Sequence, residues 1–438
     1  MTVPGQHLAL ARRTLLRAGV SALALPMLPR KARAGQASLY LRKTQTRMPF
    51  WGSAGMFGGG QTLTAAFTCE TPFWGVQPFW LNGDLAAHTI GSVAVAPTVV
   101  LNDAINPVNP SGQQDASLFV PATIGGQRSG TIPAARQGNS GIFPGNDRVH
   151  GLLLGDIVPV QSLPRMDGTL PLVLVRTYSS GPLPCAIAGD VLGMYPVGGG
   201  AFDAVSSGRI VRAGTADGDC ATSPGIVQGI ANQYLAPTGI IFHTNTFGLD
   251  VHVGGDSLFQ GYGTATLQDD PFQMAAAALS TPSLPITICK LAYQGMPSAS
   301  FMGNLGQMVA AVGPSVAVIK GESANDIAYG TQAGYQASLD ALVNLGDWCN
   351  THGTLQATAT AMPYAETASR DVLRLAFNQQ IRRSGWFYTD FDVVSDGKSP
   401  AGIQPVDSSF ARAPHPGDAG NAAIAQSVQA MFQAILAS

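Results

Sequence analysis

The chain has 438 residues, of which 45% are hydrophobic, so it can bury a large core and is long enough for about two or three domains. Only 11% of the residues are charged and the formal net charge is −2, which excludes the basic surface of a nucleic-acid-binding protein. The 52 glycines and 30 prolines follow no period, which favours a loop-rich β protein over a collagen-like one.

The first 34 residues (1–34) have the pattern of an export signal peptide. Arg12 and Arg13 precede a moderately apolar stretch at 18–28, and the small residues at 32–34 offer a cleavage site. The pattern resembles a twin-arginine signal, which predicts a mature protein that begins near Gly35 and is periplasmic or secreted. The apolar stretch is shorter than the roughly 20 residues that span a bilayer, so no transmembrane anchor is expected after cleavage. A frayed amphipathic helix is the alternative.

Five cysteines stand at wide spacings, namely Cys69, Cys185, Cys220, Cys289 and Cys349. Their number is odd, so at least one has no disulfide partner within the chain, and no zinc-binding spacing occurs. Cys185 and Cys220 could pair in an oxidising compartment, whereas the apolar run around Cys289 favours a buried thiol. No metal and no other cofactor is expected.

From residue 35 to residue 242, short apolar runs are broken roughly every ten residues by Gly, Pro, Asn and Asp. This rhythm predicts a β-rich accessory domain, with a long irregular segment wrapped around the second domain as the alternative. Five aromatic residues gather near its start: Trp51, Phe73, Trp74, Phe79 and Trp80. They form either an exposed platform that stacks on sugar rings or, more commonly, part of a β core.

From residue 243 to residue 438, predicted strands and helices alternate. Strands are expected at 249–254, 286–293, 316–320, 355–362 and 387–394. Helices are expected at 265–279, 299–312, 335–350, 368–383 and 418–436. This order predicts a three-layer α/β/α domain around a parallel sheet, whose functional groups lie at the carboxyl ends of the strands.

Residues suited to nucleophilic catalysis stand at these strand ends. Ser257 follows the first strand within Gly-Asp-Ser-Leu, Gly295 follows the second and Asn325 the third, and His415 precedes the last helix. The predicted sheet would place a nucleophile, two hydrogen-bond donors and a base along one edge. A serine hydroxyl needs an imidazole to take its proton, and the tetrahedral oxyanion needs preorganised donors.

The ordered set Gly255-Asp256-Ser257-Leu258, Gly295, Asn325-Asp326 and His415-Pro416 resembles the four sequence blocks of the SGNH (GDSL) hydrolases, over residues 245–438 only. The resemblance implies an α/β/α fold that hydrolyses esters through an acyl-serine intermediate. It also implies that Ser257 is the nucleophile and His415 the general base. The oxyanion hole would consist of the N–H groups of Ser257 and Gly295 and the side-chain amide of Asn325.

Two positions depart from this family pattern. Family members commonly carry an aspartate three residues before the histidine, where this chain has Arg412, and the nearest upstream acid is Asp407. Either Asp407 orients His415 from a folded-back loop, or a Ser–His dyad is oriented by a backbone carbonyl or by another group. In the third block, Ser323 replaces the glycine that usually stands two residues before Asn325, which leaves the backbone path into Asn325 open.

A serine hydrolase with an export signal and a β-rich domain suggests, by analogy of folds, an esterase that removes acetyl groups from a glycan or a small ester. An O-acyltransferase, which passes the acyl group to a sugar hydroxyl, uses the same residues. A non-catalytic glycan-binding protein of the cell envelope is a third possibility, in which Ser257 is a loop residue and Asn325 caps a turn. His252 is expected to be a hydrogen-bonded strand residue, and His243 is also expected to be structural.

Overall fold

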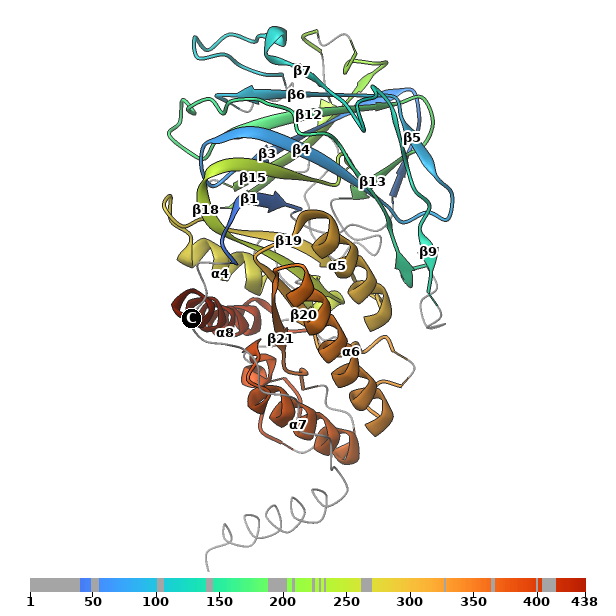
Figure 1. The fold of residues 1–438 in the computed structure, drawn as a ribbon, viewed down its shortest axis with the longest axis vertical. Helices are drawn as coiled ribbons and strands as arrows, with labels where there is room; N and C mark the ends of the chain where they lie inside the picture. Colours follow the sequence, from blue (N-terminus) through green and yellow to red (C-terminus); the bar gives the residue numbers. More distant parts are fainter. Residues whose placement is uncertain are drawn as a thin grey trace, which may run out of the picture.

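The computed structural model describes residues 40–48, 55–100, 106–138, 145–187, 203–206, 209–222, 225–227, 230–231, 234–260, 270–326, 328–363, 367–398, 401–403 and 415–438. The predicted export signal lies outside these ranges. Within them the chain forms a β-rich half and an α/β half, one above the other along the long axis of the molecule (Figure 1). No helix of the described residues is both long enough and apolar enough to cross a membrane.

The β-rich half contains short, mostly antiparallel strands. In chain order they are β2 (Gly55–Phe57), β3 (Gln61–Thr68), β4 (Phe73–Asn82), β5 (His88–Ile90), β6 (Ser92–Thr98), β7 (Val120–Ala122), β8 (Gly130–Ile132), β9 (Arg136–Gln137), β10 (Arg148–Val149), β11 (Gly151–Leu154), β12 (Leu172–Ser179), β13 (Leu183–Ile187), β14 (Asp203–Ser206), β15 (Arg209–Asp217), β16 (Ile230–Ala231) and β17 (Tyr234–Leu235). A short 3-10 helix, η1 (Ala116–Leu118), precedes β7. The largest sheet in this half has the order β14-β15-β3-β12-β6-β7, with β16 paired to β15.

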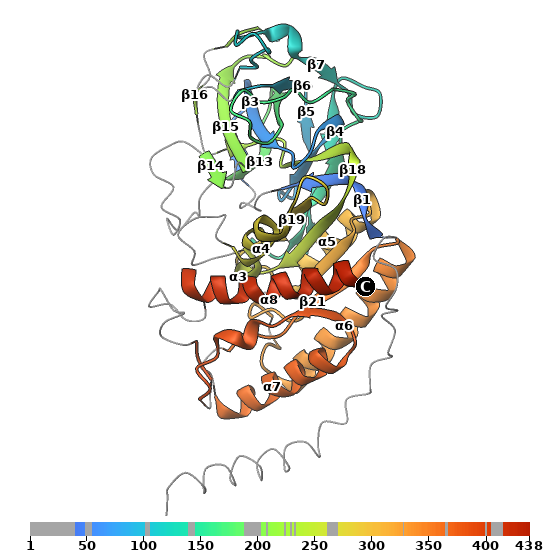
Figure 2. The ribbon, with the colours of Figure 1, turned by 90° about the vertical axis from the view of Figure 1, so that its left-hand side faces the viewer.

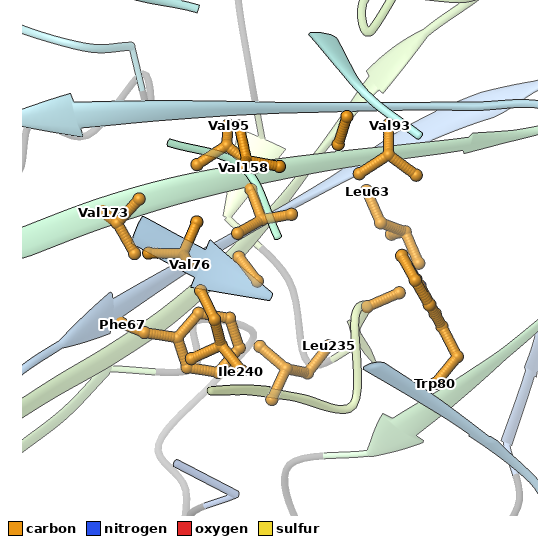
Figure 3. Close-up of a cluster of buried hydrophobic side chains, with 14 of the residues drawn as sticks. Leu63, Phe67, Val76, Trp80, Val93, Val95, Val158, Val173, Leu235 and Ile240 are labelled. Atoms are coloured by element: carbon orange, nitrogen blue, oxygen red, sulfur yellow. The ribbon is translucent and has the colours of Figure 1, made fainter. Parts of the chain in front are cut away.

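The core of the β-rich half lies between this sheet and β4. Alternate residues of β3, such as Leu63 and Phe67, face inward and meet Trp80 of β4 and Val173 of β12 (Figure 3). This alternation is the usual pattern of a strand with one face in a core. The prediction of a β-rich region before residue 243 is therefore confirmed.

The aromatic cluster near the start of this half is mostly core. Phe73, Phe79 and Trp80 are buried, whereas Trp74 is 39% exposed. Trp51 lies outside the described residues. A broad aromatic platform for sugar rings is therefore not present among the described members of the cluster. Phe73 and Trp80 belong to the β core, as the core interpretation predicts, whereas Phe79 packs in the core of the α/β half.

Strand β18 (Gly239–Gly255) connects the two halves. Its first part pairs antiparallel with β4 and with β1 (Arg42–Arg47). Its last part pairs in parallel with β19 (Ile286–Ala292) and β20 (Val316–Lys320). The predicted domain boundary between residues 242 and 243 lies inside this strand, so the two halves share one sheet.

The α/β half has the predicted alternation of strands and helices. After β18 its elements are α3 (Ser257–Gln260), α4 (Pro271–Leu279), β19, α5 (Ser298–Val312), β20, α6 (Gln332–Thr351), β21 (Leu355–Ala359), α7 (Ala368–Arg383), β22 (Phe387–Thr389), η2 (Phe391–Val394) and α8 (Asp418–Ala437). The parallel strands have the order β19-β18-β20-β21-β22. The predicted α/β fold with a parallel sheet is confirmed.

Several predicted bounds differ from the structure. The strand expected at 355–362 ends at Ala359, and the helix expected at 335–350 begins at Gln332. Two further elements differ by more. The strand expected at 387–394 ends at Thr389, because the Asp390 carboxylate accepts the N–H of Asp392 and caps the 3-10 turn of η2. The helix expected at 265–279 begins at Pro271, because Asp270 caps its N-terminus and proline favours the first helical turn. Residues 261–269 lie outside the described ranges.

Helices cover both faces of the parallel strands. Side chains of α5, α6 and α7 pack on one face, and those of α4 and α8 pack on the other. In Figure 1, α4 and α8 lie to the left of these strands and α5 and α6 to the right, and in Figure 2, α8 crosses in front of the sheet. Strands β19 and β20 flank β18, so the chain reverses its direction of winding there, and ligands bind at the carboxyl ends of strands beside such a point.

Candidate active site

Ser257 lies at the carboxyl end of β18, where α3 begins. The turn is fixed by the preceding Asp256, whose carboxylate accepts the N–H of Leu258 at 3.1 Å and whose carbonyl accepts the N–H of Gln260 at 3.0 Å. Asp256 is buried and Ser257 is partly exposed. The hydroxyl of Ser257 is therefore held at the edge of the sheet on a turn that its neighbour stabilises.

His415 lies next to Ser257, although 158 positions separate them in the chain. Its Nε2 atom is 2.9 Å from the Oγ atom of Ser257, which is hydrogen-bond distance. The turn after His415 is fixed by Asn421 of α8, whose amide donates to the carbonyls of Pro416 and Gly417, both at 3.0 Å. The structure thus brings together the predicted nucleophile and the predicted base.

Burial controls the charge of His415. It lowers the pKa of the imidazole to about 4, with the Lys320 ammonium acting in the same direction and the Asp256 carboxylate opposing it. At neutral pH the imidazole is therefore neutral and can accept a proton from Ser257.

The pKa of His415 predicts an unusual pH profile. An imidazole base must be neutral to act, so kcat/KM for an uncharged ester is expected to stay level down to about pH 5 and to fall about tenfold per unit below about pH 4. An ordinary histidine would give this acid limb near about pH 6.5. Steady-state rates measure the profile, and intrinsic fluorescence at each pH serves as the control for unfolding. An acid limb between about pH 6 and pH 7 would contradict the burial argument.

A buried ion pair joins the ends of the first and third parallel strands beside the site. The Nζ atom of Lys320, the last residue of β20, is 2.7 Å from the Oδ2 atom of Asp256, and both side chains are almost completely buried. Removing one partner of such a pair leaves an uncompensated charge and typically costs about 3–5 kcal/mol of stability. Lys320 is not among the site residues predicted from the sequence, although a lone lysine at the end of an apolar strand is a visible signal.

The hydroxyl of Ser323 connects three of the four sequence blocks. It lies 3.1 Å from Asp256 Oδ2 in the first block and 2.9 Å from the carbonyl of Met296 in the second. In the third block, the backbone N–H and the side-chain amide of Asn325 both donate to it at 3.1 Å. The serine that replaces the family's glycine therefore supplies hydrogen bonds that a glycine could not.

The Asn325 amide also contacts the second block, since its Nδ2 atom is 3.3 Å from the carbonyl of Met296. The neighbouring Asp326 accepts the N–H of Ser298 at 3.0 Å and its hydroxyl at 2.6 Å. These contacts place Asn325 against the turn that carries Gly295. Its role toward an oxyanion remains a prediction.

Gly295 lies in the turn between β19 and α5 with a backbone φ of 70°, in the left-handed region that favours glycine. The turn is tied to the end of β18 because the N–H of Tyr293 donates to the carbonyl of Gly255 at 3.2 Å. It is tied to α3 because the N–H of Gln294 donates to Gln260 Oε1 at 2.9 Å. Asp407 and Arg412 lie outside the described residues, so the group that orients His415 stays open.

The other histidines of the sequence analysis are not part of this site. His252 is fully buried, and neither ring nitrogen has a hydrogen-bond partner within the described ranges, so the expectation of a hydrogen-bonded residue is wrong there. Its Nε2 atom lies 3.7 Å from Oδ1 of the buried Asp250. His243 packs against the ring of Trp74.

The five cysteines form no disulfide in the part of the chain that the structure describes, so no disulfide joins Cys185 to Cys220. Cys289 is fully buried, as its apolar surroundings predict. Among the described residues no group of three or more His, Cys, Asp or Glu side chains could hold a metal ion.

No protein-family model and no curated protein matches the chain. Among solved structures it is similar to the psychrotrophic esterase EstA from Pseudoalteromonas sp., at 17% identity over 42% of this chain and 96% of that chain, with a TM-score of 0.33. It is also similar to a GDSL-like lipase from Bacteroides thetaiotaomicron, at 14% identity over 42% of this chain and 88% of that chain, with a TM-score of 0.33. A family two carbohydrate esterase from Cellvibrio japonicus is similar at 11% identity over 90% of this chain and 98% of that chain, with a TM-score of 0.34. At TM-scores this low the similarities carry no weight, so function rests on the residues of the site.

Proposed function

We propose that the protein is a serine esterase of the SGNH type, in which Ser257 is the nucleophile and His415 the general base. The observation that carries the proposal is the 2.9 Å separation of Ser257 Oγ and His415 Nε2 at the carboxyl end of a parallel sheet. The lowered pKa of His415 supports it, because the base is neutral at the pH at which it must act.

The reaction follows from these positions. The Oγ atom of Ser257 attacks the ester carbonyl carbon while its proton passes to His415 Nε2. The tetrahedral intermediate then collapses to the acyl-serine, and the leaving alcohol takes the proton from His415. In the second half of the reaction, water attacks the acyl carbon while His415 takes its proton. The products are the free acid and the regenerated Ser257 hydroxyl, to which His415 returns the proton.

The N–H groups of Ser257 and Gly295 and the amide of Asn325 would stabilise the oxyanion. The two amide hydrogens of Asn325 are directed to Ser323 and Met296 in this structure. The longer contact, 3.3 Å to Met296, would therefore be exchanged for the oxyanion when the substrate binds. Such a donor typically contributes about 10²–10³ in kcat.

The substrate class and location are finer parts of the proposal. The export pattern before residue 35 supports action in the periplasm or outside the cell, and the attached β-rich half supports an acylated glycan, with acetyl as the acyl group. Small acetyl esters would then be accepted as minimal substrates.

The test uses the chain from Gly35 to Ser438 with a chromogenic acetyl ester and a serine-directed phosphonate. We expect hydrolysis, together with one phosphonate per chain on the peptide that contains Ser257. Acetylated sugars offered with a sugar acceptor distinguish two enzymes, since an esterase releases acetate and an O-acyltransferase gives an acetylated acceptor. No turnover together with no labelling would contradict both and favour a non-catalytic glycan-binding protein.

A further inference from the structure

The β-rich half contacts the turn that carries Gly295. Strands β9 and β10 pair antiparallel, and β10 packs against α5, the helix that begins just after this turn. In Figure 1, β9 lies to the right of α5. From the segment that leads into β10, the Nδ2 atom of Asn146 donates to the carbonyl of Gln294 at 3.1 Å. This contact joins two residues that are 148 positions apart in the chain.

The atom that Asn146 contacts has a direct geometric link to the proposed oxyanion hole. The carbonyl of Gln294 and the N–H of Gly295 belong to the same peptide unit. A peptide unit is planar and trans, so its carbonyl and its N–H point in opposite directions. A donor that holds the carbonyl of Gln294 therefore fixes the direction of the Gly295 N–H.

The position of Asn146 is itself fixed by its neighbour Asp147. The buried carboxylate of Asp147 accepts the hydroxyl of Ser300, in the first turn of α5, at 2.6 Å. The carbonyl of Asp147 accepts the N–H of Gly138 at 2.8 Å and the side-chain amide of Gln137 at 2.9 Å. Asn146 is thus anchored both to its own hairpin and to α5.

The rest of the interface is specific and buried. The side chain of Asn304 donates to the carbonyl of Arg148 at 3.1 Å and accepts the N–H of His150 at 2.9 Å. Gly303 allows the close approach, because a Cβ atom there would lie 2.6 Å from the side chain of Val149. These buried hydrogen bonds and this close packing hold β10 and α5 in one fixed arrangement.

We propose that Asn146 is a positioning residue of the active site, supplied by the β-rich half, and that it orients the N–H of Gly295 toward the oxyanion. The inference rests on the proposed esterase function and deepens it. The β-rich half then contributes to catalysis, because its Asn146 sets the direction of one oxyanion donor, the N–H of Gly295. The side chain of Gln260 accepts the N–H of Gln294 at 2.9 Å, so both the N–H and the carbonyl of Gln294 are held by hydrogen bonds.

The test compares Asn146→Asp with Gln307→Ala in the chain from Gly35 to Ser438. Asn146→Asp keeps the size of the side chain but removes the donor to Gln294. Gln307 contacts the carbonyl of His150 at 3.0 Å, in the same interface but farther along α5, so its replacement is the matched control. We expect Asn146→Asp to lower kcat by about tenfold or more with KM within about twofold, and Gln307→Ala to change neither.

Hydrogen exchange of the peptide that covers residues 293–298 gives a readout that needs no activity. It should become faster in Asn146→Asp and stay unchanged in Gln307→Ala, while the melting temperature of Asn146→Asp stays close to that of the wild type. An unchanged kcat or unchanged exchange in Asn146→Asp would overturn the inference. If the wild-type protein hydrolyses no ester, the proposed function fails, and the exchange measurement alone then decides whether Asn146 holds this turn.

Discussion

Replacing Ser257 with alanine is expected to lower kcat/KM for an acetyl ester by about 10⁴-fold or more, with little change in stability. The hydroxyl is the only protein group of the proposed mechanism that forms a bond to the acyl carbon, and its Oγ atom lies 2.9 Å from Nε2 of the proposed base, His415. Ser257 is partly exposed, so the loss of one oxygen leaves no large cavity. Steady-state hydrolysis and thermal unfolding measure the two effects.

Ser283 offers the matched control for this substitution. It lies in the loop before β19, at the amino end of that strand, and its hydroxyl contacts only Thr281 among the described hydrogen bonds. Ser283→Ala should therefore keep full activity. Retention of more than about a tenth of the wild-type rate in Ser257→Ala would contradict the assignment of the nucleophile.

His415→Ala should produce a loss close to that of Ser257→Ala, because the base acts only through the serine. The double variant should then be no slower than either single variant, since residues that act as one unit are not additive. Additive losses would mean that His415 contributes by a route that does not pass through Ser257.

The sequence predicts those parts of the fold whose signals are local. The strand at 316–320 is a short apolar run, and helix 368–383 follows a threonine that caps its N-terminus, so both are predicted at the bounds that the structure gives. The helix expected at 265–279 begins at Pro271 instead. Asp270-Pro271 is a local start signal, but the prediction followed the pattern of apolar residues. The extent of β18 could not be predicted. Its first part is defined by pairing with β1 and β4, and such pairing produces no periodic pattern of apolar residues in the sequence.

In the candidate site, too, features with a signal in the sequence could be predicted, and contacts that form only in the folded chain could not. Ser257 and His415 could be proposed together because the order of strands predicts which loops share an edge of the sheet. The contacts of Lys320 with Asp256, and of Asn146 with Gln294, join residues 64 and 148 positions apart. Such pairs depend on how side chains pack in three dimensions, and no spacing rule in a single sequence indicates them.

A chain that begins at residue 243 is expected not to fold, even though it contains every predicted catalytic residue. The cut lies inside β18 and removes its pairing with β1 and β4. The core beneath α5 and α6 also contains four buried residues from before the cut, namely Met48, Phe79, Leu81 and Ile241. Each such side chain typically stabilises a core by about 2–5 kcal/mol, so their combined loss of roughly 8–20 kcal/mol is as large as the roughly 5–15 kcal/mol by which most domains are stable.

The cut also removes the partners of a buried carboxylate. Asp250 is fully buried on β18 and accepts hydrogen bonds from the backbone N–H of Thr46 at 3.1 Å and from its hydroxyl at 2.8 Å. Without β1, this carboxylate would lose both, which adds the cost of an underbonded buried group. Near-ultraviolet circular dichroism and calorimetry should show a cooperative transition for the chain from Gly35 and none for the fragment 243–438. A soluble fragment with a cooperative transition and esterase activity would instead mean that the α/β half folds alone, and that β18 joins two units whose stabilities are independent.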